Sequence, residues 1–296
     1  MRRGSGRQAP IVFIFPAFAF VFLFTLYPAL YTAVLSFTDA SLLTPAYSFV
    51  GLRNYSSLLM GQEFWANLRI TLVFVLTTVV FQLVLGLGLA LLTNMPKRGC
   101  VFVRTVALIA WVIPEVIVAL TFKWMFIGDK YGIINYTFAR LFPPGGVEWL
   151  AHPGLAMFVA IITCVWRGTA FSMVLELAGL QSIPVHLYEC ASIDGATAVQ
   201  GFRLITLPLL RPTMVVNLIF ITLATFNVMS LVYVLTGGGP FLATEVISIA
   251  MYKEAFKFFR IGYAASMAMI MFAINLLFVI VYIRIMQRGA AGQGAA

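Results

Sequence analysis

The residues able to do chemistry in this 296-residue chain are few and widely separated. Its two histidines, His152 and His186, lie far apart and form no His-Glu-x-x-His pattern, so a metal-dependent hydrolase site is missing. The glycine-rich run 236–240 lacks the Lys-Ser/Thr pair of a phosphate-binding loop, and we interpret it as a turn that ends a helix. The three cysteines show no paired spacing. The sequence therefore predicts no catalytic residue, no metal site and no cofactor site in this chain.

Three ionisable side chains, Glu115, Arg167 and Glu176, lie within or near the ends of long apolar segments. Charges in a lipid bilayer are costly and usually face the interior of a helix bundle or a watery cavity. A place on a transport pathway is therefore one interpretation, and snorkelling or pairing with another helix is the alternative. Arg167 and Glu176 are nine residues apart, about two and a half helical turns, so we do not expect them to pair with each other.

The polar stretch 182–208 is the only sizeable interruption between apolar segments in the second half of the chain. It predicts two short helices separated by a turn at Asp194-Gly195, with Ser182 as the N-cap of the first helix and Pro184 in its first turn. Glu189 and Asp194 are acids among otherwise basic segments. That contrast favours contact with a partner over a solvated loop.

The elements that must position these residues are membrane-spanning helices. Hydrophobic residues make up 62% of the chain and charged residues 10%, and the mean hydropathy is +1.00, which predicts an all-α, multi-pass membrane protein without a separate soluble domain. Six spans are predicted, at about 11–37, 69–92, 102–126, 154–180, 213–235 and 261–286. The first is too long for a signal peptide and lacks a cleavage site, so we expect it to be retained.

Six spans place both termini on one side of the membrane. Basic residues near the two ends and in the 94–101 turn favour the cytoplasm for that side, and this topology explains the net charge of +9 without nucleic acid as a partner. The tails 1–10 and 287–296 and the loop 181–212, between the fourth and fifth spans, are then cytoplasmic. The segment 252–260 interleaves basic and aromatic residues, which predicts an amphipathic helix at the outer interface that either anchors the chain in the membrane or docks a partner.

Within the polar stretch, residues 189–196 followed by Phe202, Ile205, Leu207 and Pro208 resemble the EAA motif of ABC importer permeases. Cys190 stands where the motif usually has alanine, but it is also small. Further stretches resemble the carbohydrate-uptake, maltose-type branch of that family: 49–55, 132–135, 179–184, 233–240 and 261–264. The resemblance covers nearly the whole chain from about Pro16 onward.

The resemblance implies a permease subunit in a bacterial cytoplasmic (inner) membrane that imports a sugar or sugar-like solute. Its partners would be a second homologous permease, two ATPase subunits that hold ATP and Mg²⁺, an extracytoplasmic binding protein and membrane lipid. The two short helices would be coupling helices seated on the ATPase, with Glu189 facing a basic residue there. The implied coupling residues are Glu189, Ala191, Asp194, Gly195, Ala196 and Pro208.

For the substrate path, the family places contacts on the helices before and after this loop. The corresponding residues are Gly168, Phe171, Ile221, Thr222 and Thr225, and the charged Arg167 is added to them as a further candidate. Helix packing is the alternative role for them. Two other functions stay open: a glycerol-phosphate or polyol permease of the same family, and an ion-coupled secondary transporter, which would be expected to show internal repeats and charged relays.

Overall fold

A computed structural model describes residues 8–95, 98–128, 131–137 and 146–291 of the chain. These parts are helical and contain no strand, which confirms the all-α prediction. Five helices are long and apolar enough to cross a membrane, and the bent pair α5 and α6 brings the number to six if it is counted as one span. Most of the two predicted tails, and the basic residues Arg2, Arg3, Arg7 and Lys97, lie outside the described residues.

The chain divides into two compact units. The first comprises Met1–Trp65 and Ala250–Ala273, and the second comprises Ala66–Ile249 and Ile274–Ala296. Two long helices, α4 (Gln62–Thr93) and α14 (Ile261–Ala291), and the shorter α13 (Ile247–Phe256) contribute to both units. The ionisable residues Glu115, Arg167 and Glu176 lie in the second unit.

In the first unit, α1 (Gln8–Val21) continues through a π-helical turn, η1 (Phe22–Leu26), into α2 (Tyr27–Leu35), and α3 (Arg53–Met60) follows. The π turn ends two residues before Pro28, as a second one, η2 (Phe202–Thr206), ends two residues before Pro208. A proline has no N–H to donate and its ring displaces the carbonyl four residues earlier. The helix therefore shifts to a wider turn instead of breaking.

The connection after α2 is held by local hydrogen bonds. The amide of Asn54 donates to the carbonyls of Ser36 and Thr38 at 2.9 and 2.8 Å. The carboxylate of Asp39 accepts bonds from the backbone N–H and the hydroxyl of Ser48 at 2.5 and 2.7 Å. These bonds, the backbone one first, hold the pKa of Asp39 below its usual value, because they stabilise the ionised carboxylate.

The segment 252–260 does not form one amphipathic helix. Helix α13 ends at Phe256 and α14 begins at Ile261, with a turn between them. Arg260 Nη2 lies 2.6 Å from Glu254 Oε2, and its guanidinium carbon lies 5.0 Å from the centre of the Tyr263 ring. The exposed side chain of Arg260, just before α14, is thus paired with residues of both flanking helices.

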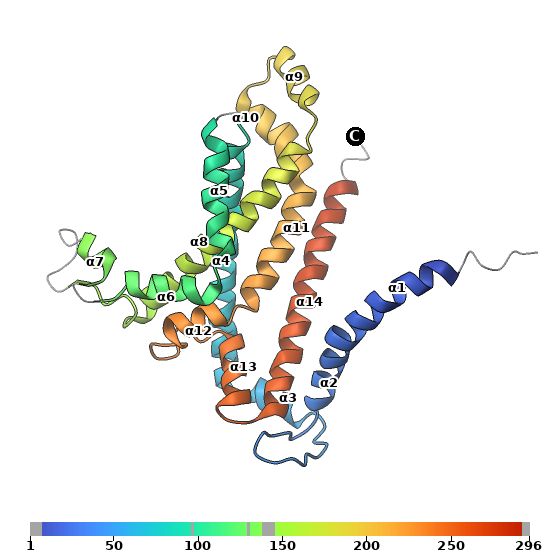
Figure 1. The fold of residues 1–296 in the computed structure, drawn as a ribbon, viewed down its shortest axis with the longest axis vertical. Coiled ribbons are helices and arrows are strands. Elements are labelled where there is room, and N and C mark those ends of the chain that lie inside the picture. Colours follow the sequence, from blue (N-terminus) through green and yellow to red (C-terminus); the bar gives the residue numbers. More distant parts are fainter. Residues whose placement is uncertain (1–7, 96–97, 129–130, 138–145, 292–296) are drawn as a thin grey trace, which may run out of the picture. The chain divides into compact units, whose positions relative to one another are not determined.

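In the second unit, α5 (Arg98–Val112), α8 (Pro153–Gln181) and α11 (Leu207–Phe226) pack with residues 66–93 of α4, as Figure 1 shows. Small residues allow close approach: a Cβ added at Gly86 would lie 2.5 Å from Ser172 Cβ, and one at Gly168 would lie 2.2 Å from Gln82 Nε2. Buried apolar residues form a cluster at the loop end of these helices: Ala90, Met173, Leu177, Leu180, Ile183 and Leu210.

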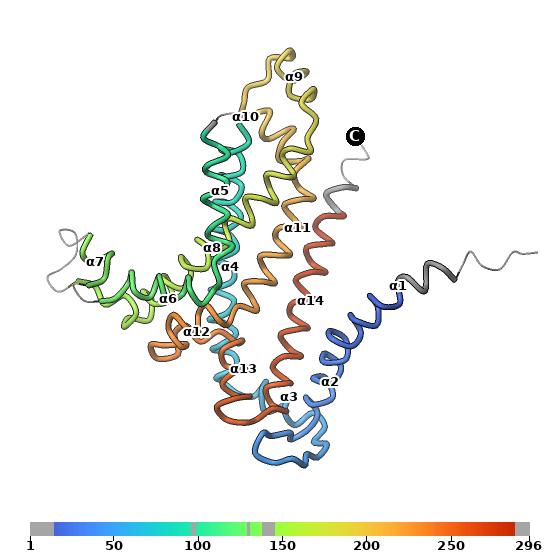
Figure 2. The backbone as a smooth tube through the Cα atoms, in the orientation of Figure 1, coloured from blue at the N-terminus to red at the C-terminus, as the bar shows by residue number. Residues whose placement is uncertain are grey.

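Two predicted spans differ in detail from the helices observed. The third is bent by 99° between α5 and α6 (Glu115–Met125), where Pro114 cannot continue the helical hydrogen bonding, and Figure 2 shows this turn. In the region of the fifth, the apolar helix runs over Ala198–Phe226, and α12 (Ser230–Thr236) is separate. Helix α11 ends at Phe226, and the carbonyl of Leu223 accepts both the backbone N–H of the C-cap Asn227, at 3.2 Å, and its side-chain amide, at 2.7 Å.

The run 236–240 ends a helix, as predicted. Gly237 is the C-cap of α12 in the left-handed conformation, with φ of 65°. The short α7 (Ile133–Thr137) lies in the loop between α6 and α8. There Asn135 accepts a bond from the Trp149 indole at 2.9 Å and donates to the carbonyl of Gly128 at 2.8 Å. Both stretches belong to the motifs quoted above, and in the described residues both stabilise turns.

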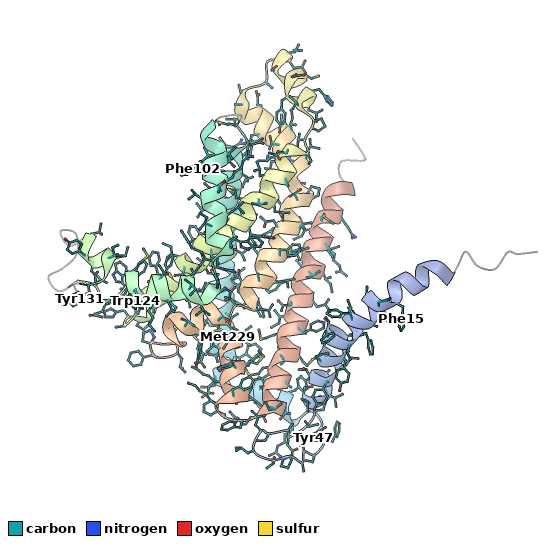
Figure 3. All side chains as sticks on the ribbon, in the orientation of Figure 1. Phe15, Tyr47, Phe102, Trp124, Tyr131 and Met229 are labelled. Carbon is teal, nitrogen blue, oxygen red and sulfur yellow. The ribbon has the colours of Figure 1, made fainter. Side chains whose placement is uncertain are left out.

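Apolar side chains cover much of the exposed surface. Phe102, Trp124 and Tyr131, labelled in Figure 3, are 72%, 72% and 77% exposed, and no residue of Phe15–Leu35 is buried. A water-soluble monomer rarely exposes so many large apolar groups. A surface of this kind is suited to lipid or to other membrane subunits.

Candidate functional site

A cavity of about 210 Å³ lies within the second unit, between α4, α5, α6, α8, α11 and the start of α12. Its lining residues are Gln82, Trp111, Glu115, Cys164, Arg167, Gly168, Phe171, Phe220, Ile221, Ala224, Thr225, Val228 and Leu231. Five of the six residues expected on the substrate path are among them. The sixth, Thr222, lies outside the lining, and its hydroxyl is 3.1 Å from that of Tyr282.

An ion pair forms the charged part of the cavity wall. Arg167 Nη1 on α8 lies 3.1 Å from Glu115 Oε1, and the two side chains are 25% and 35% exposed. The bend at Pro114 places Glu115 in the first turn of α6, where the helix dipole favours a carboxylate. The two residues are 52 positions apart in the sequence, so their spacing gave no sign of the pair.

Aromatic rings form the apolar part of the cavity wall. Phe171 lies between Trp111 and Phe220, with ring centres 5.7 and 5.9 Å away. Three helices, α5, α8 and α11, each contribute one of these rings. The result is an apolar wall in a cavity that also offers a carboxylate, a guanidinium and the Thr225 hydroxyl.

Gln82 is one of the lining residues that the sequence did not predict, as are Trp111 and Phe220 of the aromatic wall. Its side-chain Nε2 donates to the carbonyl of Cys164 at 3.0 Å and so joins α4 to α8. Gly168 leaves the room for this amide, since a Cβ there would overlap it. The signal available in the sequence was an amide side chain in the middle of an otherwise apolar span. In the structure only 3% of its surface is exposed.

Glu176, the third ionisable residue noted in the spans, does not line the cavity. It is fully buried and accepts a hydrogen bond from Asn217 Nδ2 at 2.9 Å, while the same amide lies 2.5 Å from Ser172 Oγ. This polar contact joins α8 to α11. As expected, Arg167 and Glu176 do not pair with each other, and each has a partner on another helix.

The polar stretch after α8 forms two short helices, as predicted. Helix α9 (Val185–Ile193) is followed by the C-cap Asp194 and a left-handed glycine, Gly195, with φ of 78°. The N–H of Ala196 donates to the carbonyl of Ala191 at 2.9 Å, and that of Gly195 donates to Ser192 at 3.2 Å. These two bonds define a Schellman cap, which satisfies the last carbonyls of α9.

The cap predicted at the start of α9 is wrong. Ser182 belongs to the end of α8, where its hydroxyl donates to the carbonyl of Gly179 at 2.7 Å, and the residue before α9 is Pro184. The second helix, α10 (Ala198–Gly201), has a complete capping box between Thr197 and Gln200. It continues through η2 into α11, so only α9 stands apart from the long helices.

The predicted coupling residues lie on the surface of this loop. Glu189, Asp194 and Gly195 are exposed, and Ala191, Ala196 and Pro208 are half-buried. A hydrogen bond of 2.9 Å between the hydroxyls of Tyr188 and Thr206 ties α9 to η2, while Ile193 is 85% exposed. The loop is therefore a braced projection with an apolar residue and two carboxylates facing outward.

Taken together, a bundle of apolar helices, a partly polar cavity within it and a braced projection at one end of α8 define a membrane transport subunit. Residues 82–288 match the family described as "Binding-protein-dependent transport system inner membrane component". The chain is 38% identical over 275 residues to the trehalose/maltose transport system permease protein MalF of Thermococcus litoralis, covering 92% of this chain and 91% of the relative. It is 35% identical over 285 residues to the sulfoquinovosyl glycerol transport system permease protein SmoG of Agrobacterium fabrum, covering 96% and 92%.

The fold is shared with a solved transporter. A chain in the crystal structure of a bacterial alginate ABC transporter, in complex with an alginate pentasaccharide-bound periplasmic protein, matches with a TM-score of 0.82 at 22% identity, covering 95% of this chain and 94% of that chain. The chain thus belongs to the family of inner membrane components of binding-protein-dependent transport systems. It is an ABC importer permease located in the inner membrane, and it is a transport subunit, not an enzyme.

Proposed function

We propose that this chain is the permease of a sugar importer and that its cavity is part of the path of the sugar. The observation that carries the proposal is the cavity itself, in which an ion pair and an aromatic wall face one space between membrane helices. The hydroxyl groups of a sugar can form hydrogen bonds with the ion pair, and its apolar C–H faces can pack on the aromatic wall. The 38% identity to a trehalose/maltose permease supports the same substrate class.

The loop 181–212 is the proposed attachment point of a separate ATPase, which would hold ATP and Mg²⁺. Exposed carboxylates and small residues on α9 and its cap support this assignment, because they allow close approach and a charge-assisted contact with a basic partner. On this proposal the loop and both termini face the cytoplasm. A second homologous permease, two ATPase copies and an extracytoplasmic binding protein complete the importer, and transport proceeds by alternating access.

The test of the substrate path replaces one ring of the aromatic wall. Phe171→Ala should weaken the apparent affinity for trehalose or maltose by about two- to tenfold, the size of one aromatic contact. Phe158 is the matched control, because it lies on the same helix, is 48% exposed and does not line the cavity. The measurement is uptake by proteoliposomes of the complete importer, and equal effects of Phe171→Ala and Phe158→Ala would assign Phe171 to packing.

A further inference from the structure

The charge of the cargo is not decided by similarity. Of the two relatives named above, one is named for trehalose and maltose, which are uncharged, and the other for a sulfoquinovosyl glycerol, which carries a sulfonate. Building on the proposed sugar path, we propose that this cavity accepts uncharged sugar rings and that Glu115 sets this preference by neutralising Arg167.

The charges of the described lining residues cancel. Arg167 and Glu115 are the only arginine, lysine, aspartate or glutamate side chains among the described lining residues, and they form one ion pair. An arginine that recognises a carboxylate or sulfonate presents two parallel N–H donors to it. Here Glu115 already occupies one Nη position of that fork. An anionic cargo would have to displace Glu115 or approach it closely, and either change leaves a negative charge without a partner in a cavity of low dielectric constant.

The same pair suits hydroxyl groups. Both side chains are partly exposed to the cavity, so the carboxylate can accept hydrogen bonds and the remaining N–H groups of Arg167 can donate them. The ring of Phe171, between Trp111 and Phe220, offers an apolar face to the C–H side of a sugar ring. An uncharged ring satisfies both surfaces without breaking the ion pair, and rejection of anions then comes from the carboxylate of Glu115.

The experiment compares two probes that differ only at C6, which is an uncharged hydroxymethyl group in methyl α-D-glucopyranoside and a carboxylate in the corresponding methyl glucopyranosiduronate. Their dissociation constants from the purified, assembled importer are measured by saturation-transfer difference NMR. The wild type should bind the uncharged probe more tightly. Glu115→Gln should shift the ratio of the two constants toward the uronate by at least about tenfold, as expected for one uncompensated unit charge within about 6 Å. Arg167→Gln should shift it the other way.

The double variant, Glu115→Gln with Arg167→Gln, restores neutrality and should return the ratio to near the wild-type value. It also guards against misfolding of a variant with one unpaired charge. Trp111→Ala marks the cavity, since it should weaken binding of both probes. An unchanged ratio in all charge variants, or tighter binding of the uronate by the wild type, would overturn the inference about charge. If binding still depended on Trp111 in that case, the proposed sugar path would be supported. No Trp111-dependent signal for either probe would overturn both.

Discussion

Gly195 gives the sharpest test of the coupling loop, because its contribution can be isolated to the backbone. It adopts a φ of 78° in the cap of α9, and a Cβ added there would have no neighbouring atom within 4 Å. Gly195→Ala therefore introduces no clash. Its cost is the left-handed conformation of a residue with a Cβ, about 1–2 kcal/mol, which lowers the ratio of capped to uncapped loop by about 5–30-fold.

The assay is binding of the ATPase to the permease in detergent, together with ATP hydrolysis stimulated by loaded binding protein. The apparent affinity for the ATPase should fall by up to the same factor, since only the capped loop is competent to bind. Gly195→Asn should lose less, because asparagine tolerates the left-handed region although its side chain is larger. The order Gly, Asn, Ala thus separates backbone strain from side-chain bulk.

Gly201 provides a matched control in the same loop. A Cβ added at this residue would also meet open space, but its φ is −56°, in the helical region. Gly201→Ala should leave coupling unchanged, because alanine is favoured over glycine in a helix. Equal losses at the two glycines, or wild-type coupling in Gly195→Ala, would refute the assignment of the cap.

Three further predictions concern other parts of the chain. Glu189→Lys should abolish uptake and stimulated ATP hydrolysis while the protein still inserts, whereas normal transport would remove Glu189 from the proposed interface. Gly168→Ala should displace the Gln82 amide, at a cost of about 1–3 kcal/mol, and reduce uptake; Gly154→Ala on the same helix, where a Cβ has open space, should not. The bonds from Ser48 lower the pKa of Asp39 in the folded state, so the ionised carboxylate stabilises the fold at pH values above the unfolded-state pKa of about 3.9. This contribution is lost as the pH falls through the lower folded-state pKa. Thermal unfolding between about pH 2 and 6 should therefore show a smaller acid-induced loss for Asp39→Asn, and an unchanged loss would contradict this role.

Sequence patterns predicted the helical membrane class and the two-helix loop because both depend on local information. Apolar runs mark segments for the bilayer, and Asp194-Gly195 marks a turn whatever surrounds it. The cavity depends on distant contacts instead. The pairing of Glu115 with Arg167 requires the bend at Pro114. Hydropathy cannot express that bend, since its window averages across the break.

Ser182 and Thr222 show a second limit of sequence patterns. Ser182 has the right residue type for a helix N-cap, but a hydroxyl can also donate to a carbonyl at the end of the preceding helix, and it does so here. Thr222 follows a cavity residue in the sequence, yet a rotation of about 100° per residue turns it toward Tyr282. In both cases a shift of a few residues along a helix decides the environment, and residue type does not encode that shift.

The continuity of α8 has a mechanical consequence. No proline follows its first residue, Pro153, until Pro184, and one unbroken helix carries Phe171 of the cavity wall and ends at Gln181 beside the loop. Ten residues of helix span about 15 Å, so a tilt of about 10° moves one end of this length by about 2.6 Å relative to the other. Helix α11, by contrast, follows a π turn and contains Pro212. Of the two helices that flank the loop, α8 is the stiff lever arm and α11 the compliant one.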